Sequence, residues 1–324
     1  MKIIQPYHRH LKHDCTPYEF IEKIGRTCYK STDKITEGSA EKFVSNLKKR
    51  NHWAMLEHET IYLSFTGYDN YKELLDTIHL IGHNLKFFNL TEVEKEVYVF
   101  SGNLRSFYEL FELSQCINTS SIIINMYDIV SYAYELIYSD LTLSGKEVET
   151  AEAILYTREE FIQKYKKHRN VLFQHLTHTV MFVCDRGVSH ELVRHRPCSF
   201  AQESTRYCNY SQDKFGQEIT VIYPFFYRKD NDREAEYAVW ERSMKDAEAA
   251  YIALLNSGST PQEARSVLPN SLKTEIIMTA TESEWQHIVN LRAKGVTGAP
   301  HPQMVEIMYP WYEEIENITE GRVV

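Results

Sequence analysis

The 324-residue chain contains no run of about eighteen apolar residues, so it offers no candidate for a transmembrane helix. Its first residues, Met1 to Pro6, lack the apolar core of a secretory signal peptide. No internal repeat or low-complexity linker interrupts the sequence. We therefore expect a cytoplasmic protein with no membrane partner.

Closely spaced cysteine pairs are also missing. None of the six cysteines forms a Cys-x-x-Cys motif; they are Cys15, Cys28, Cys116, Cys184, Cys198 and Cys208. Zinc sites and disulfide frameworks usually depend on such spacings. We expect reduced thiols and no metal.

Positive charge is scarce. Acidic residues number 45 against 36 lysines and arginines, which gives a formal net charge of −9. Proteins that bind nucleic acid in bulk need a basic surface, because the phosphate backbone dominates their affinity. The composition thus argues against a nucleic-acid partner.

One short segment departs from this acidic background. Between residues 194 and 207 lie Arg194, Arg196 and Arg206. The same segment holds one imidazole and three hydroxyl side chains: His195, Ser199, Ser204 and Thr205. A guanidinium presents a rigid fork of donors that matches two phosphate oxygens, and hydroxyls can complete the shell. The segment indicates either a site for a phosphorylated small molecule or a solvated basic surface.

Periodicity and capping signals predict an α+β fold. We expect strands at residues 1–5, 60–65, 97–100 and 178–184. Helices are expected at residues 17–29, 39–50, 70–90, 104–116 and 232–257, with helical patterns over 120–170. Ser189 is placed to cap a helix that carries Arg194 and Arg196. Because strands and helices do not alternate strictly, we predict an antiparallel or mixed sheet flanked by helices.

The C-terminal third is predicted to be rich in helices. Gly258 suits the end of the helix at 232–257. Thr260 and Glu263 then form a capping box for the next helix. A second Thr-x-x-Glu motif at 281–284 begins a helix that continues through Arg292.

Arg292 is a candidate site residue on periodicity alone. On the helix begun at Thr281 it falls on one apolar stripe with Trp285, Ile288 and Val289. A buried guanidinium is costly unless it is paired. Arg292 therefore requires either a carboxylate partner or a ligand.

The triplet Arg194-His195-Arg196, followed after seven residues by Ser204, resembles the signature of the flavin-dependent thymidylate synthases, the ThyX family. The flanking segments 184–193 and 208–211 resemble a longer, divergent branch of that family. The resemblance implies a single ThyX-like catalytic domain over residues 1–324. It also implies a family-variable insertion at about 68–175, for which we expect packing and oligomer contacts.

The resemblance further implies an activity, the reductive methylation of dUMP to dTMP. Methylenetetrahydrofolate would donate the carbon, and NADPH would supply electrons through FAD. No cysteine would become attached to the uracil. Family members form homotetramers whose active sites are shared between subunits.

Site residues follow from the same resemblance. Arg292 would activate dUMP at a uracil carbonyl, and Ser204 is the other catalytic candidate. Positions that match flavin contacts are His58, Thr60, Arg194, His195, Arg196, Gln202, Ser283 and His287. Positions that match substrate contacts are Glu191, Arg194, Gln202, Glu203, Ser204, Thr205, Arg206 and Arg265.

Three departures from the family pattern bear on function. Glu191 stands where other members often have glutamine, and Gln202 where many have glutamate. The usual Asn-x-Arg and Asn flavin contacts are replaced by Thr281, Ser283 and His287. A nucleotide-binding sensor without turnover is therefore a second hypothesis, and an RNA-binding protein is a third, which the acidic charge opposes.

Overall fold

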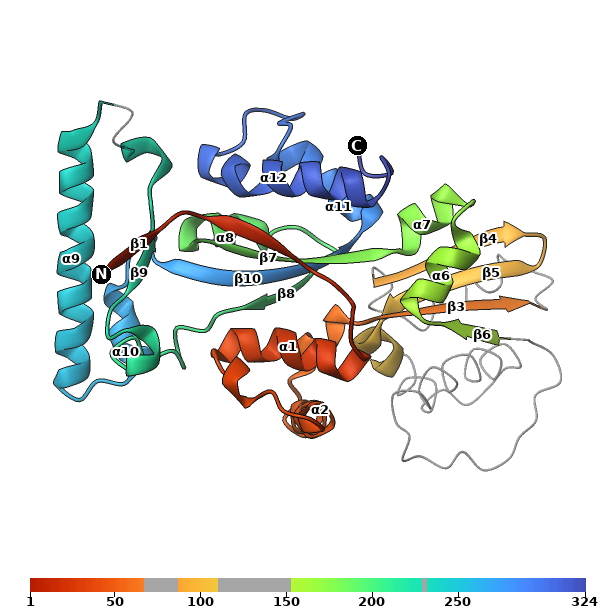
Figure 1. The fold of residues 1–324 in the computed structure, drawn as a ribbon, viewed down its shortest axis with the longest axis horizontal. Coiled ribbons are helices and arrows are strands. Elements are labelled where there is room, and N and C mark those ends of the chain that lie inside the picture. Colours follow the sequence, from red (N-terminus) through yellow and green to blue (C-terminus); the bar gives the residue numbers. More distant parts are fainter. Residues whose placement is uncertain (67–86, 110–152, 229–231) are drawn as a thin grey trace. The chain divides into compact units, whose positions relative to one another are not determined.

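The computed structural model describes residues 1–66, 87–109, 153–228 and 232–324. The chain divides into two compact units, whose elements are labelled in Figure 1. The first unit comprises Met1–Asn46, His178–Ala280 and Glu284–Val324, and the second comprises Leu47–Thr177 and Thr281–Ser283.

The first unit is built on a four-stranded sheet of order β2-β7-β10-β8. These strands are β2 (Tyr7–Leu11), β7 (Thr177–Asp185), β10 (Lys273–Thr281) and β8 (Ser199–Gln202). β2 runs antiparallel to β7, and β8 runs antiparallel to β10. The central strands β7 and β10 are almost wholly buried, as expected for apolar strands covered on both faces.

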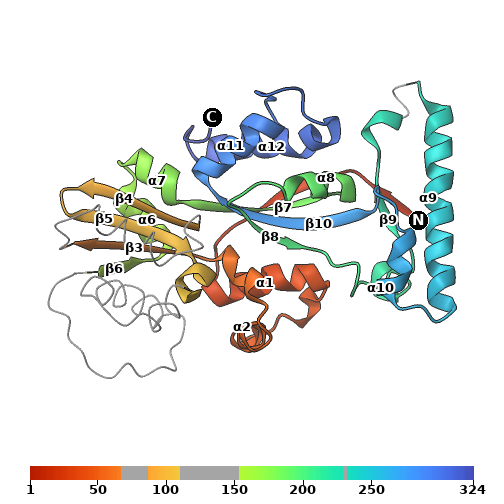
Figure 2. The same ribbon diagram turned by 180° about the vertical axis from the view of Figure 1, so that it is seen from behind.

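Helices cover both faces of this sheet (Figures 1 and 2). On one face lie α8 (Arg186–Leu192), α11 (Glu282–Arg292) and α12 (Pro302–Ile318). On the other lies α1 (Pro17–Tyr29), which is followed along the chain by α2 (Ser39–Lys49). The core between the sheet and these helices includes Phe182 and Met278 from the strands, Trp285 from α11 and Trp311 from α12.

A second core in the first unit surrounds the parallel pair β1 (Lys2–Ile4) and β9 (Thr220–Ile222). The long helix α9 (Glu234–Asn256) and the short helix α10 (Pro261–Ala264) pack there. The predicted capping box of α10 is present, since the hydroxyl of its N-cap residue accepts from the Glu263 N–H.

The second unit holds an antiparallel sheet of order β4-β5-β3-β6. Its strands are β3 (Thr60–Thr66), β4 (Phe88–Glu94), β5 (Val97–Asn103) and β6 (Ala153–Tyr156). Helices α6 (Arg158–Tyr165) and α7 (Arg169–His175) pack on it. Three of the four strands come from the predicted insertion, so these residues complete a sheet begun by β3.

The predicted fold class is confirmed: antiparallel and mixed sheets are flanked by helices, and the C-terminal third is rich in helices. Two helix predictions are wrong in part, because residues 88–90 belong to β4 and residues 153–156 to β6. Residues 88–90 pair with the neighbouring strand β5 and residues 153–156 with the distant strand β3, and this pairing outweighs their local pattern. Residues 70–86, 110–116 and 120–152 of the helix predictions lie outside the described residues. The prediction of a single catalytic domain stays a prediction.

Among the described residues, no helix combines the length and apolarity needed to cross a membrane.

Candidate active site

Helix α8 begins directly after β7 and carries the first group of site residues. Its N-cap is Asp185, whose Oδ1 accepts from the Val188 N–H at 2.7 Å. The expected N-cap at Ser189 is therefore wrong, because a carboxylate four residues earlier already satisfies the free N–H groups. Asp185 Oδ2 also accepts from the Gln303 amide at 2.6 Å, which ties α8 to α12.

The signature triplet follows α8 in a turn, so the prediction that a helix carries Arg194 and Arg196 is also wrong. Both arginines are exposed, and within the described residues neither guanidinium has an ion pair or hydrogen bond. His195 between them is buried. Burial, followed by the charges of Arg292 and His287, lowers the pKa of His195 to about 4. Its imidazole is therefore neutral at pH 7.

Arg292, at the end of α11, contacts that neutral imidazole. Its Nε donates to His195 Nε2 at 3.0 Å, which places the imidazole proton on Nδ1. Its Nη1 donates to Glu191 Oε2 at 2.8 Å. The sequence left open whether a carboxylate or a ligand pairs with Arg292, and the structure shows a carboxylate. It belongs to Glu191, which stands where other family members often have glutamine.

Strand β8 positions Gln202 against helix α8 and strand β10. Its amide donates to Ser189 Oγ at 2.9 Å and to Thr274 Oγ1 at 3.2 Å. Gln202 thus connects β8 to α8 and β10, at the point where the chain leaves the sheet for the segment 203–207.

Glu203 is held in a buried network of alternating charge. Tyr210 donates to one of its carboxylate oxygens at 3.1 Å, and Lys273 donates to the other at 2.8 Å. Burial lowers the pKa of Lys273, but the carboxylates of Glu203 and Glu275 outweigh it and the pKa is raised. Lys30 completes the network by an ion pair with Glu275. Both Glu203 oxygens are thus engaged, and its predicted substrate contact stays a prediction.

Residues 204–206 differ in their exposure and in their hydrogen bonds. The Ser204 N–H donates to the Cys28 carbonyl at 3.2 Å, and within the described residues its hydroxyl has no hydrogen-bonded base. Thr205 is buried, whereas Arg206 is exposed with its guanidinium over the Tyr207 ring. Ser204 therefore lacks the partner that a nucleophile would require.

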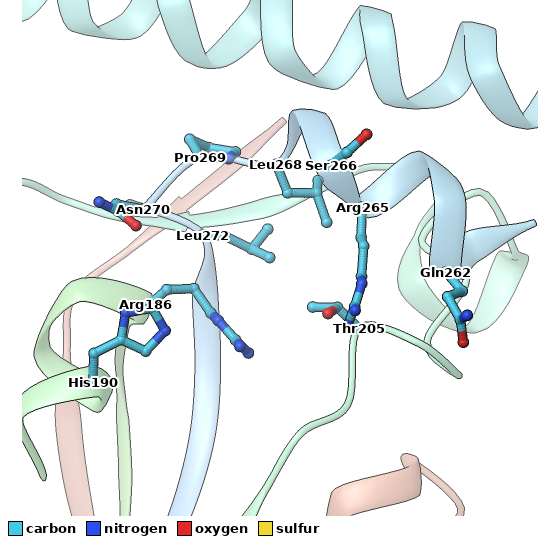
Figure 3. Close-up of a pocket in the computed structure, with 10 residues that line it drawn as sticks. All are labelled: Arg186, His190, Thr205, Gln262, Arg265, Ser266, Leu268, Pro269, Asn270 and Leu272. Atoms are coloured by element: carbon cyan, nitrogen blue, oxygen red, sulfur yellow. The ribbon is translucent and has the colours of Figure 1, made fainter. Parts of the chain in front are cut away.

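A pocket of about 500 Å³ opens between α8 and the segment that follows α10. Figure 3 shows Arg265 extending toward Thr205 while Arg186 extends from the start of α8. Ten residues line it: Arg186, His190, Thr205, Gln262, Arg265, Ser266, Leu268, Pro269, Asn270 and Leu272. None of them is a carboxylate, and within the described residues neither guanidinium has an ion pair or hydrogen bond. Two unpaired guanidinium groups make this a pocket for an anion.

The structure thus places Thr205 and Arg265, two of the predicted substrate contacts, in one pocket, and it adds Arg186 and His190, which the sequence analysis did not select. These two residues are four apart on α8 and so share one face of the helix. This spacing, within the segment 184–193, is the sequence signal that could have identified both residues.

Four predicted flavin contacts lie on the second unit or on α11. His58 is fully buried at the end of the 3₁₀ helix η2 (Trp53–His58), and Thr60 Oγ1 shares a hydrogen bond with Thr177 at 3.0 Å. Ser283 shares one with Thr281 at 2.9 Å. His287 is exposed on α11, with its ring 6.4 Å from that of His195. Their contacts with a flavin stay predictions.

Metal ligands are not grouped in the described part of the chain, where no cluster of three His, Cys, Asp or Glu residues could hold an ion. Burial raises the pKa of the Cys28 thiol to about 12, and it also raises the pKa values of Cys184 and Cys198. These three thiols remain protonated at neutral pH and are poor nucleophiles.

Fold and site together define an α+β protein with a pocket that suits an anion and a partly buried Arg-His-Glu cluster. The model of the family "Thymidylate synthase complementing protein" matches residues 122–318, more than half of the chain. The chain belongs to this family. The match includes all the predicted site residues from Glu191 to Arg292, whereas His58 and Thr60 lie before it.

Curated relatives agree with this assignment. A flavin-dependent thymidylate synthase of Pyrococcus furiosus is 33% identical over 39% of this chain and 49% of its own length. One from Pyrococcus abyssi is 31% identical over 48% of this chain and 61% of its own. The chain thus spans about half the length of the curated relatives that it matches.

A solved structure of the UMP/dUMP methylase PolB from Streptomyces cacaoi, bound with 5-Br UMP, also matches. It is 20% identical, covers 50% of this chain and 81% of its own, and has a TM-score of 0.40. A likeness of this size supports no argument about the site.

Proposed function

We propose that the chain is a flavin-dependent thymidylate synthase that converts dUMP to dTMP. Methylenetetrahydrofolate donates the carbon, and NADPH is the reductant through FAD. Family membership supports this proposal, as do the names of the relatives. The observation that carries it is the pocket with two unpaired guanidinium groups beside the cluster that holds Arg292.

The pocket suits the phosphate of dUMP. Arg186 and Arg265 supply paired donors, and the Thr205 hydroxyl and the His190 imidazole can complete the shell. Arg206 and Ser204, on the adjacent segment, are the further phosphate ligands of the proposal. A monophosphate carries about two negative charges near neutral pH, which two guanidinium groups balance.

Arg292 suits the uracil. Its Nε and Nη1 are taken by His195 and Glu191, and within the described residues Nη2 has no hydrogen-bond partner. A fixed guanidinium stabilises negative charge that develops on the pyrimidine ring, which makes the ring carbon more nucleophilic. No cysteine is required as a nucleophile, and the protonated thiols of Cys28, Cys184 and Cys198 agree with that.

The residues present also fit FAD. Arg194 and Arg196 are exposed guanidinium groups without partners, which suit a pyrophosphate. Neutral His195 and Gln202 can hydrogen-bond to uncharged edges of a flavin. The proposal keeps His58, Thr60, Ser283 and His287 as flavin contacts on the family resemblance alone. When bound, the flavin supplies the redox chemistry.

A flavin spectrum tests this proposal. The purified protein, or the protein reconstituted with FAD, is expected to show visible flavin absorption. Anaerobic NADPH should bleach that band, and dTMP should appear once dUMP and methylenetetrahydrofolate are added. A colourless protein that FAD cannot reconstitute would contradict the proposal.

A second candidate is a nucleotide-binding sensor that keeps the pocket without turnover. The ion pair between Glu191 and Arg292 favours it, because a carboxylate offsets the charge that should activate the uracil. Such a sensor binds dUMP but forms no dTMP with any combination of reductant and folate.

A further inference from the structure

We propose that Glu191 is the positioning residue that fixes the orientation of Arg292 toward the base of the bound nucleotide. This inference rests on the proposed function, since it takes dUMP as the ligand of the site. The family resemblance identified Glu191 only as a substrate contact and gave it no partner within the chain.

The Arg292 side chain is restrained at two of its three nitrogens. Glu191 Oε2 accepts from Nη1 at 2.8 Å, and His195 Nε2 accepts from Nε at 3.0 Å. A planar guanidinium held at two nitrogens cannot rotate about its long side chain without losing one contact. Nη2 is therefore presented in one direction, available to a carbonyl oxygen of the base.

The two acceptors differ in charge, and that difference selects Glu191 as the stronger restraint. His195 is buried and neutral, so its contact joins a cation to an uncharged acceptor. The Glu191 contact joins two opposite charges, so electrostatic attraction adds to the hydrogen bond. Removal of the carboxylate should leave Arg292 held by the imidazole alone.

Helix α8 couples this restraint to the pocket. Arg186 and His190 line the pocket, and Glu191 is the neighbour of His190 on the same short helix. The residues that contact the phosphate and the residue that orients Arg292 thus share one element, whose start is fixed by Asp185. One helix thus holds the residues that contact the phosphate and the residue that orients Arg292 toward the base.

The test compares two ligands that differ only in the base. Calorimetric dissociation constants are measured for dUMP and for 2′-deoxyribose 5-phosphate with the flavin-loaded protein. Glu191→Ala is expected to raise the ratio of the dUMP constant to the sugar phosphate constant by roughly tenfold to a hundredfold. Glu191→Gln, which keeps an acceptor and the side-chain shape, should raise the ratio less.

Two controls separate positioning from a structural role. Glu306→Ala breaks the ion pair between Arg228 and Glu306, whose side chains are buried to a similar degree, and should leave the ratio unchanged. In an Arg292→Ala background, Glu191→Ala should change the ratio less than about twofold, because the restrained group is gone.

An unchanged ratio in both Glu191 variants would overturn the inference while leaving the proposed function intact, provided that the wild-type protein binds dUMP. An equal weakening of both ligands would overturn it too, since that is the signature of a structural role. A wild-type protein that does not bind dUMP would reject the proposed function, and the inference with it.

Discussion

Arg186 and Arg265 present unpaired positive charge to one pocket, whereas Arg292 shares its charge with Glu191. These residues have the same chemistry but different tasks. An unpaired guanidinium gains the most binding free energy when it contacts a phosphate. A restrained guanidinium holds its donors in a fixed orientation toward the ligand.

Replacement of Arg186 by alanine should therefore weaken nucleotide binding. We expect the dissociation constant of dUMP to rise roughly tenfold to a hundredfold, since one charged hydrogen-bonding group is lost. Binding of 2′-deoxyribose 5-phosphate should weaken by the same factor. Arg233→Ala removes a partly exposed arginine that pairs with Glu236 in the first turn of α9, and it serves as the control. Unchanged affinity in Arg186→Ala would contradict the pocket assignment.

His195 predicts a dependence of stability on pH. Its pKa lies at about 4 in the folded protein, below the ordinary value of 6.5, so the unfolded chain binds more protons between these values. The stability that the neutral imidazole contributes is therefore complete above pH 6.5 and is lost as the pH falls toward 4.

Urea unfolding at pH 7.5 and pH 5 measures this effect. The wild-type midpoint should fall more steeply with pH than that of His195→Gln, whose side chain can still accept from Arg292. His175, whose pKa burial lowers to about 3, contributes the same trend to both proteins and cancels in the difference. Equal slopes would show that His195 is not the responsible group.

At the scale of elements, α8 supports the site. Asp185 caps it, and the same carboxylate binds Gln303 of α12. Asp185→Ala should lower the free energy of unfolding by about 1–2 kcal/mol. It should also weaken dUMP binding, because α8 carries Arg186 and His190.

A matched loss of a helix cap is the control for this prediction. Thr157 caps α6 in the second unit with a capping box. Thr157→Ala should lower stability by a comparable amount and leave dUMP affinity unchanged. If Asp185→Ala keeps wild-type affinity, α8 does not hold the pocket in place.

The sequence predicted the elements whose formation depends on residues close together in the chain. The helix at 17–29 was found from its amphipathic pattern, and the capping box at Thr260 from the residues at the start of its helix. Strands β8 and β10 were missed, since their identity depends on pairing between segments some seventy positions apart. α12 was missed because Pro310 stands in its interior, a position that normally breaks a helix.

The same difference between neighbouring and distant residues explains which parts of the site could be predicted. The family signature and Arg292 could be found from spacing, but the pairing of Arg292 with Glu191 joins residues 101 positions apart. The pocket likewise depends on Arg186 and Arg265 meeting in space. Sequence reasoning named Thr205, Arg265 and the three residues of the Arg292 cluster, but it missed Arg186 and His190 and could not say which residues touch.

At the scale of the whole molecule, we predict a homotetramer with shared active sites. Helix α9 supports an interface, since only Trp240, Met244 and Tyr251 of its 23 residues are buried, and Val239 is 54% exposed. Light scattering should give four times the chain mass of 38.1 kDa. A fully active monomer would contradict this prediction.

The central claim is that this chain methylates dUMP, and release of tritium from C5 of labelled dUMP tests it most directly. The wild-type protein should release tritium only when methylenetetrahydrofolate and NADPH are both present. Arg292→Ala should lose the release by about a hundredfold or more while retaining its flavin spectrum. Tight binding of dUMP by the wild-type protein without any release would contradict the claim and identify a nucleotide sensor.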